Sequence, residues 1–273
     1  MLTGCINKIS LPQKNEYPVT IQDVKFTQCP CNTIVLSDCI ADIILAENYE
    51  INLRAKSSNC SQTELSSLED VGSLDNINID KIKSIKPDVV LADENTPGNV
   101  ISLLYNNNIK TIVFNNAKIR SEIENLYIQI GTMFGGNVSG NKKALKTATN
   151  IFFILDDIDR AIPTTYAHHT ACYMFDDTGK IVTGNDYPAS LLTLAGAFNI
   201  ASGEADNKID IDKIKFSNPD FIFCDIGVKE KILANDTFKD LNAVKNGNIF
   251  EMDKYMMCRQ GKTMIDATTF MAH

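Results

Sequence analysis

The chain has 273 residues, of which 44% are apolar and 22% are charged. At about 150 residues per domain, this length predicts two ordinary domains or one large one. The composition can bury a core and lacks the bias of disordered or collagen-like chains. The formal charge is −8, whereas nucleic-acid binders need clustered cations. These values exclude a stapled mini-protein, argue against a nucleic-acid partner and predict a soluble globular protein.

The first residues resemble a lipid attachment signal. Leu2-Thr3-Gly4-Cys5 resembles the lipobox after which a bacterial lipoprotein signal is cut and the cysteine is lipidated, although no apolar stretch precedes it. The polar residues 7–17 suit a tether. No run of about 18 apolar residues is present to span a bilayer. We predict that residues 1–16 are a lipoprotein tether attached to the membrane only through a lipid on Cys5; an accidental match is the alternative.

The remaining cysteines do not predict a disulfide scaffold. They are odd in number and lie at Cys29, Cys31, Cys39, Cys60, Cys172, Cys224 and Cys258. The sequence contains no CxxC pair, which would have suggested structural zinc or thioredoxin-like redox chemistry. We interpret most of these cysteines as small buried hydrophobes, and the sequence leaves any pairing open.

One local pattern occurs twice in the chain. Asp80 and its neighbours Ile79 to Lys83 recur 132 positions later around Asp212, and a Pro-Asp pair follows each copy. Each copy then continues into an apolar run that ends in an aspartate, Asp93 or Asp225. The pattern predicts a short helix stopped by proline and then a buried strand. Since open α/β sheets bind ligands at such strand ends, the repeat indicates two lobes with one plan.

The other elements follow in chain order. The first lobe (17–117) is predicted to contain strands 33–37, 50–54, 88–92 and 110–114 and helices 39–46 and 99–107. The connector (118–162) is predicted to hold helical patterns 119–133 and 145–162, interrupted at Gly135-Gly136. The second lobe (163–273) is predicted to contain strands 171–175, 221–224 and 248–252 and helix 187–197. The predicted fold is α/β, with two Rossmann-like lobes joined by a single long α-helix and a ligand cleft between them.

Motifs along nearly the whole chain resemble the substrate-binding proteins of ABC importers for iron-siderophore complexes, haem and cobalamin. The resemblance rests on the order of these motifs along the chain and on the spacing between them. The motifs lie in residues 33–37, 42–44, 71–73, 80–91, 183–201 and 241–247. It implies two α/β lobes spanned by one long helix, with the ligand held in the cleft. It also implies an acidic residue on each lobe that docks onto the permease, matched here by Asp80 and Asp212. The alternative is that each aspartate only caps its helix.

The family pattern also places a set of side chains at the cleft. The resulting candidate ligand-binding residues are Asp38, Cys39, Arg54, Ser73, Asp75, Asn76, Asp93, Glu94, Asp186, Tyr187, Asp225, Tyr255, Met256 and Arg259. Either arginine could bind a carboxylate or catecholate oxygen through paired hydrogen bonds, or lie in a solvated loop. Tyr255 and Met256 suit a haem or corrinoid rim, or equally a hydrophobic lid. The many acidic candidates favour a neutral or cationic complex.

Bare metal binding and catalysis find little support in the sequence. The three histidines, His168, His169 and His273, are too few and too dispersed for a zinc or manganese site. No Gly-x-Ser-x-Gly elbow, Walker loop or GxGxxG motif follows a strand. We therefore expect no metal site, no catalytic residue and no cofactor.

The expected function is binding and release at a membrane. The protein would be a monomeric lipid-anchored receptor on the extracellular face of the cytoplasmic membrane, or in the periplasm. It would capture a ferric siderophore, haem or cobalamin and deliver it to the transmembrane subunits of an ABC permease. Two alternatives stay open: a metal-cluster or chelatase-type enzyme that uses Cys39, Cys60 and Cys224, and a surface sensor that no longer transports.

Overall fold

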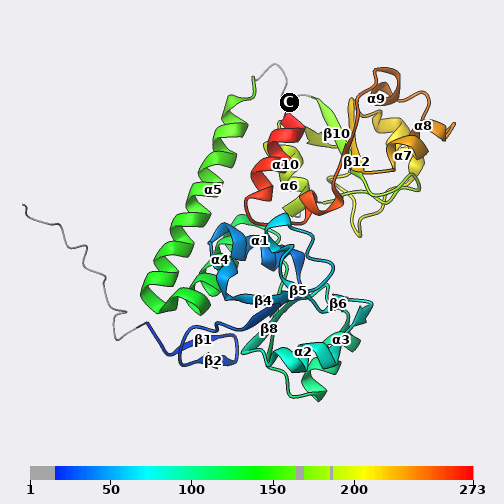
Figure 1. Cartoon of the computed structure of the whole chain (residues 1–273). Coiled ribbons are helices and arrows are strands. Elements are labelled where there is room, and N and C mark those ends of the chain that lie inside the picture. Colours follow the sequence, from blue (N-terminus) through cyan, green and yellow to red (C-terminus); the bar gives the residue numbers. More distant parts are fainter. Residues whose placement is uncertain (1–15, 164–168, 185–186, 273) are drawn as a thin grey trace, which may run out of the picture.

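The computed structural model describes residues 16–163, 169–184 and 187–272. Two α/β lobes lie beside a helical connector whose long helix runs past both of them (Figure 1). The predicted two-lobed α/β architecture is confirmed, while the residue limits given for tether, lobes and connector stay predictions.

The N-terminal lobe is built on a five-stranded parallel sheet in the order β5-β4-β3-β8-β9. Its strands are β3 (Thr33–Val35), β4 (Leu53–Lys56), β5 (Glu69–Asp70), β8 (Val89–Asp93) and β9 (Thr111–Phe114). Its helices are α1 (Asp38–Ala46), α2 (Ile79–Ile85) and α3 (Gly98–Asn106), with short 3-10 helices at Glu50–Asn52 and Thr63–Leu65. Two antiparallel hairpins, β1 (Val19–Ile21) with β2 (Val24–Phe26) and β6 (Gly72–Ser73) with β7 (Asn76–Ile77), complete it.

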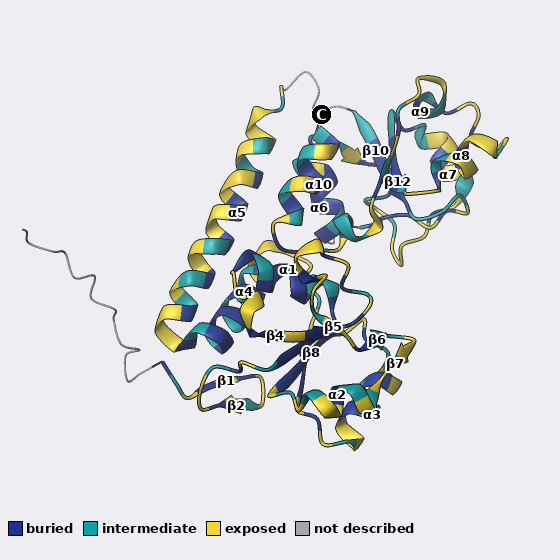
Figure 2. Cartoon of the chain, in the orientation of Figure 1, coloured by how far each residue is buried: buried dark blue, intermediate teal, exposed yellow. Residues whose placement is uncertain are grey.

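The sheet of this lobe is covered on both faces, as its continuous apolar strands predict. Val35, Val89 and Leu91 point to the core shared with α1 and α4. Ile34 and Val90, the alternate residues, point to a second core beneath α2 and α3. Figure 2 shows the central strand β8 buried and the outer helix faces exposed.

The predicted strand at 50–54 is wrong in its first half. Residues Glu50–Asn52 form a 3-10 helix, and β4 begins only at Leu53. The cause is local: Asn48 takes a left-handed conformation (φ 53°), and the Asn52 N–H then bonds back to the Tyr49 carbonyl at 3.0 Å. The chain therefore completes a turn before it can enter the sheet.

The connector consists of α4 (Arg120–Gly135), a wide helical turn (Gly136–Gly140) and α5 (Asn141–Ala161). The 21 residues of α5 make a helix roughly 30 Å long. The glycines at the turn allow the two helices to approach closely, since a Cβ on Gly140 would overlap the Gly131 carbonyl oxygen. The Glu16 carboxylate accepts hydrogen bonds from the Val138 and Ser139 N–H groups and so fixes this turn. None of the described helices is both long and apolar enough to cross a membrane.

The C-terminal lobe holds a four-stranded parallel sheet in the order β11-β10-β12-β13. The strands are β10 (Thr170–Met174), β11 (Phe198–Asn199), β12 (Phe221–Asp225) and β13 (Ile249–Met252). The helices are α6 (Tyr187–Leu194), α7 (Ile211–Ser217), α8 (Lys229–Ala234), α9 (Asn242–Lys245) and α10 (Thr263–Ala272), and a 3-10 helix spans Lys254–Met257. Helix α6 ends before the predicted 197 because Gly196 turns the chain at φ 81° into β11.

The sequence repeat corresponds to a structural repeat. Helices α2 and α7 both end in a left-handed residue, Lys86 or Asn218, and lead into the central strands β8 and β12. The aspartates of the two Pro-Asp pairs also have matching contacts. Asp88 accepts a hydrogen bond from the Asn32 N–H at 2.9 Å and Asp220 from the Thr170 N–H at 3.0 Å, each just before or at the start of the neighbouring strand.

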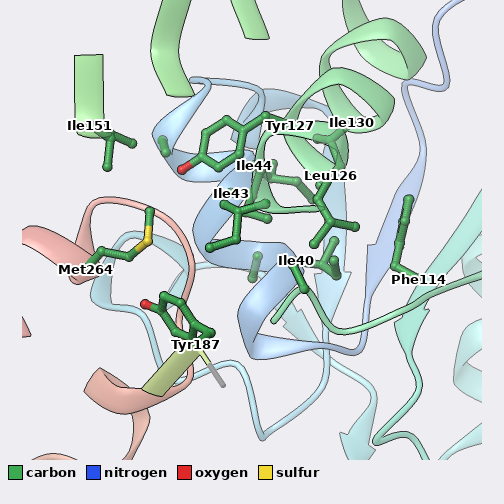
Figure 3. Packing of buried hydrophobic residues seen from close by; sticks show 14 of the residues in the cluster. Ile40, Ile43, Ile44, Phe114, Leu126, Tyr127, Ile130, Ile151, Tyr187 and Met264 are labelled. Atoms are coloured by element: carbon green, nitrogen blue, oxygen red, sulfur yellow. The ribbon is translucent and has the colours of Figure 1, made fainter. Parts of the chain in front are cut away.

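One hydrophobic core continues from the first lobe into the second. Figure 3 shows α1 and α4 packed against Tyr187 of α6 and Met264 of α10. Tyr187 is 4% exposed and Met264 is 1% exposed. The base of the interlobe junction is therefore buried and apolar.

Candidate functional site

The two lobes meet again at a polar contact near the carboxyl ends of β3 and β13. Strand β3 leads into the first turn of α1, which carries Asp38 and Cys39. Strand β13 leads into residues 254–261, which carry Cys258 and Arg259. The Cys39 Sγ lies 2.5 Å from the Cys258 carbonyl oxygen, so the two segments are in direct contact. This arrangement places the ends of both sheets at one shared surface, as the strand-end rule predicts.

The centre of this contact is a bidentate ion pair. Arg259 donates from Nε to Asp38 Oδ2 at 2.7 Å and from Nη2 to Asp38 Oδ1 at 3.0 Å. The side chains are only 12% and 10% exposed, and Arg259 also donates to Ser61 Oγ at 2.7 Å. Burial raises the pKa of the Asp38 carboxyl, and the guanidinium opposes that rise. The Nε and Nη2 groups of the predicted ligand-binding arginine are therefore engaged within the protein in this conformation.

A second carboxylate supports the segment that carries Arg259. Asp42 accepts hydrogen bonds from the Gly261 N–H at 2.6 Å and from Thr263 Oγ1 at 3.0 Å. Burial raises the pKa of Asp42 to about 6, although both hydrogen bonds lower it. Beside it lies a groove of about 610 Å³ lined from both lobes, including Ser61, Asp253 and Met256.

The C-terminal lobe adds an aromatic and acidic surface. Tyr173 Oη donates to Asp225 Oδ1 at 2.7 Å. Burial raises the pKa of the Asp225 carboxyl, while the Tyr173 hydrogen bond and nearby Lys254 lower it. The Tyr255 ring has the Arg259 guanidinium 5.2 Å from its centroid and the Lys254 ammonium 4.8 Å from it. Charged and aromatic side chains thus lie next to one another on this surface of the C-terminal lobe.

Several of the predicted residues lie elsewhere. Tyr187 is buried, and its hydroxyl donates to the Arg259 carbonyl at 2.5 Å, so it supports the loop from beneath. Arg54 lies near the amino end of β4, whereas the interlobe contact lies at the carboxyl ends of the strands. Arg54 donates a hydrogen bond to the Ile51 carbonyl. Asp93 is 6% exposed and accepts a hydrogen bond from Ser37 Oγ at 2.5 Å.

The remaining candidates are more exposed or outside the description. Glu94 is exposed and lines a separate groove of about 580 Å³ with residues of α4. Ser73, Asp75 and Asn76 form the β6–β7 hairpin. Asp186 and the lipidation residue Cys5 lie outside the described residues.

The structure thus brings together Asp38, Cys39, Asp225, Tyr255, Met256 and Arg259 around the interlobe contact. Sequence reasoning missed Ser61, Asp42 as a contact of the loop, and Cys258. Ser61 had no signal of its own, whereas Cys258 adjoins the predicted Arg259.

The proposed permease-docking residues are surface residues on matching helices. Asp80 and Asp212 are exposed in the first turns of α2 and α7, which lie in different lobes and away from α5 (Figure 1). Neither aspartate is the N-cap residue of its helix, although both lie in the first turn, where a negative charge favours the helix dipole. The caps are Asn78, which accepts from the Lys81 N–H at 2.9 Å, and Asp210, which accepts from the Asp212 N–H at 3.0 Å.

The cysteines named for a metal-cluster enzyme do not converge. Cys60 is buried in the core that includes α1, and Cys224 is buried in a separate core of the C-terminal lobe. Within residues 16–163, 169–184 and 187–272, no three His, Cys, Asp or Glu side chains are grouped to hold a metal ion. His169 Nδ1 lies 3.7 Å from Asp220 Oδ2. This residue precedes β10, at the end of the strand opposite the interlobe contact.

Comparison with known proteins identifies relatives over most of the chain. The family model described as "Periplasmic binding protein" matches residues 34–256. An uncharacterized ABC transporter substrate-binding lipoprotein of Bacillus subtilis, YvrC, is 27% identical over 293 residues, covering 100% of this chain and 92% of that protein.

Two solved structures have the same fold. A periplasmic heme binding protein from Pseudomonas aeruginosa superposes with a TM-score of 0.77 at 15% identity, covering 89% of this chain and 91% of its own. The periplasmic vitamin B12 binding protein of Vibrio cholerae superposes with a TM-score of 0.65 at 20% identity, covering 89% and 96%.

Proposed function

Because the chain belongs to the periplasmic binding protein family, we propose that it is the solute-binding lipoprotein of an ABC importer and carries a metal chelate to the membrane permease. The observation that carries this proposal is the interlobe surface, where the carboxyl ends of two parallel sheets meet across the Asp38–Arg259 pair. Binding and release there need no covalent chemistry. The family is one of solute-binding transport proteins, and the cysteines that an enzyme would need are separated.

The charge of this surface favours a neutral or cationic chelate. Its carboxylates outnumber its cations: Asp38, Asp42, Asp225 and Asp253 lie around Arg259 and Lys254. An anionic ferric catecholate would be repelled by this excess, whereas a ferric hydroxamate or cobalamin would not. Haem lies between these cases, because its two propionates give it a small net negative charge. Tyr255 and Met256 supply the flat and soft contacts that a large organic ligand needs.

A thermal-shift panel tests the cargo. The purified protein is heated with haem, cobalamin, ferric hydroxamate, ferric catecholate or molybdate, each well above a plausible Kd. At about 100 times Kd a ligand adds roughly 2.7 kcal/mol, which raises Tm by a few degrees in a chain of this size. The shift should shrink in Asp225→Asn and persist in Asp236→Asn, whose side chain is 97% exposed. If none of the ligands raises Tm, the proposal that the cargo is one of these chelates is contradicted.

Docking is tested by charge reversal on both lobes. In Asp80→Lys combined with Asp212→Lys we expect uptake by cells to be lost while the Tm shift with the cargo stays unchanged. The matched control reverses Asp236 and Asp240, exposed acidic residues before α9. Uptake that survives the first double change would refute the docking assignment.

The location follows from the same proposal. The chain works as a monomer outside the cytoplasm, held to the membrane by a lipid on Cys5, in agreement with the lipoprotein description of the B. subtilis relative. Expression of Cys5→Ser should move the protein from the membrane fraction to the medium or periplasm. If the unchanged protein already fractionates as soluble, the anchor is refuted.

A further inference from the structure

Two thiols from different lobes meet at the interlobe contact. Cys39 is the second residue of α1, and Cys258 follows the 3-10 helix Lys254–Met257. Although 219 positions separate them, the Cys39 thiol donates to the Cys258 carbonyl at 2.5 Å, and the Cys258 thiol donates to the Tyr255 carbonyl at 3.3 Å. Their neighbours Asp38 and Arg259 form the bidentate ion pair, so two consecutive residues of each segment face each other.

The other described cysteines are either buried or too close in sequence to bridge easily. Cys172 and Cys224 lie on adjacent strands β10 and β12 but are fully buried. Cys60 is also buried, and Cys29 and Cys31 are too close in sequence to bridge each other without strain. Among the described cysteines that are far apart in sequence, the interlobe pair brings an exposed thiol, Cys258, next to a partly exposed one, Cys39.

We propose that Cys39 and Cys258 form a reversible disulfide that locks the two lobes together. The oxidant is a low-molecular-weight or protein disulfide, RSSR. Cys258, the exposed thiol, attacks it as the thiolate, forms a mixed disulfide and releases one RSH. Cys39 then loses its proton, attacks the Cys258 sulfur and releases the second RSH. Two protein thiols and one RSSR thus become one protein disulfide and two RSH.

The environment of the two sulfurs sets this order. The hydrogen bond with Cys258 and burial raise the pKa of the Cys39 thiol, which makes Cys39 the slower nucleophile toward an external oxidant. Once Cys258 carries a mixed disulfide, the ion pair beside it already holds Cys39 within reach. The oxidising setting rests on the proposed location outside the cytoplasm, but the chemistry itself is independent of the cargo.

The first test is chemical. The purified full chain is equilibrated in oxidised and reduced glutathione, alkylated, digested and analysed by mass spectrometry. We expect a Cys39–Cys258 cross-linked peptide and the loss of two free thiols, both reversed by dithiothreitol. Cys31→Ser, which removes another exposed thiol, should behave as the unchanged protein, and Cys258→Ser should lose the cross-link. A stable glutathione adduct on Cys258 without the cross-linked peptide would overturn the proposal.

The second test measures the lock. The bridged protein should melt several degrees higher than the reduced protein, because the bond closes a very long loop. Amide hydrogen exchange in residues 38–42 and 254–262 should slow at least tenfold on oxidation. Cys258→Ser should show neither change. A cross-linked protein with unchanged melting and exchange would refute the lock even if the thermal-shift panel identifies a cargo, so the two proposals fail separately.

Discussion

A buried carboxyl without a hydrogen-bond partner makes the stability of this protein depend on pH. Glu47 ends α1 and is fully buried, and neither of its carboxyl oxygens has a hydrogen-bond partner in the described structure. Burial raises its pKa to about 9, which Lys143 of α5 only partly offsets. Tyr49 and Tyr127 also face it and carry no charge near neutral pH. Glu47 is therefore protonated in the folded protein at pH 7.

The direction of the effect follows from linkage. The pKa of Glu47 is 4.5 in the unfolded chain and about 9 in the folded protein. Below pH 4.5 both states hold the proton and the folded protein has its full stability. As the pH rises from 4.5 toward 9, the unfolded chain releases the proton first, and the free energy of unfolding falls. At pH 7 the folded chain must hold a proton that the unfolded chain has released, at a cost of about 3 kcal/mol at roughly 1.4 kcal/mol per pH unit. This cost is insensitive to the folded-state pKa as long as that pKa lies well above 7.

Replacing Glu47 by glutamine tests this magnitude, because glutamine has the shape of the neutral acid and needs no proton. We expect Glu47→Gln to be more stable than the unchanged protein by about 3 kcal/mol at pH 7 and by less than about 1 kcal/mol at pH 5. Urea unfolding followed by circular dichroism at both pH values measures the difference. Glu50→Gln, on the exposed surface close by, should show no such pH dependence. An equal effect of Glu47→Gln at both pH values would refute the reasoning.

Two further substitutions have clear expected outcomes. Gly72→Ala should lower the free energy of unfolding by roughly 1–3 kcal/mol in a thermal unfolding assay. The reason is that φ of Gly72 is 97° and the new Cβ would lie 2.4 Å from the Asn76 carbonyl oxygen. Gly98→Ala should have no such effect, because a Cβ on Gly98 would meet open space. Arg259→Ala should cost about 3 kcal/mol at pH 7 by leaving the Asp38 carboxylate buried without its cation, and adding Asp38→Asn should recover much of that loss in the same denaturation assay.

Local patterns were enough to predict the architecture because each lobe repeats a short-range rule. The Pro-Asp pairs at 87–88 and 219–220 end one helix and begin one strand, and both were predicted correctly. Failures occurred where a side chain or turn overrode the pattern. Polar and apolar side chains alternate over residues 50–54 as in a strand, but residues 50–52 form a 3-10 helix after the left-handed Asn48.

The site was predicted less well because its geometry joins distant residues. Asp38 and Arg259 were each named as ligand contacts, but their pairing across 221 positions has no local signature. Tyr187 was named for the cleft, yet the apolar face of α6 packs against α1 and α10 and takes the tyrosine into the core. A sequence pattern assigns a residue to a strand or helix end, whereas the direction of its side chain depends on what packs beside it.

The two kinds of interlobe contact also limit how the cleft can open. At the base, Ile40, Ile43 and Tyr187 belong to one buried apolar core, and separating them would expose apolar surface at a cost of about 25 cal/mol per Å². At the rim, Asp38 and Arg259 would exchange their mutual contact for water, which costs much less because hydration replaces both hydrogen bonds. We therefore expect opening to begin at the rim while the base and the α4–α5 connector stay in place. At the proposed binding surface, ligand exchange would begin with the separation of Arg259 from Asp38.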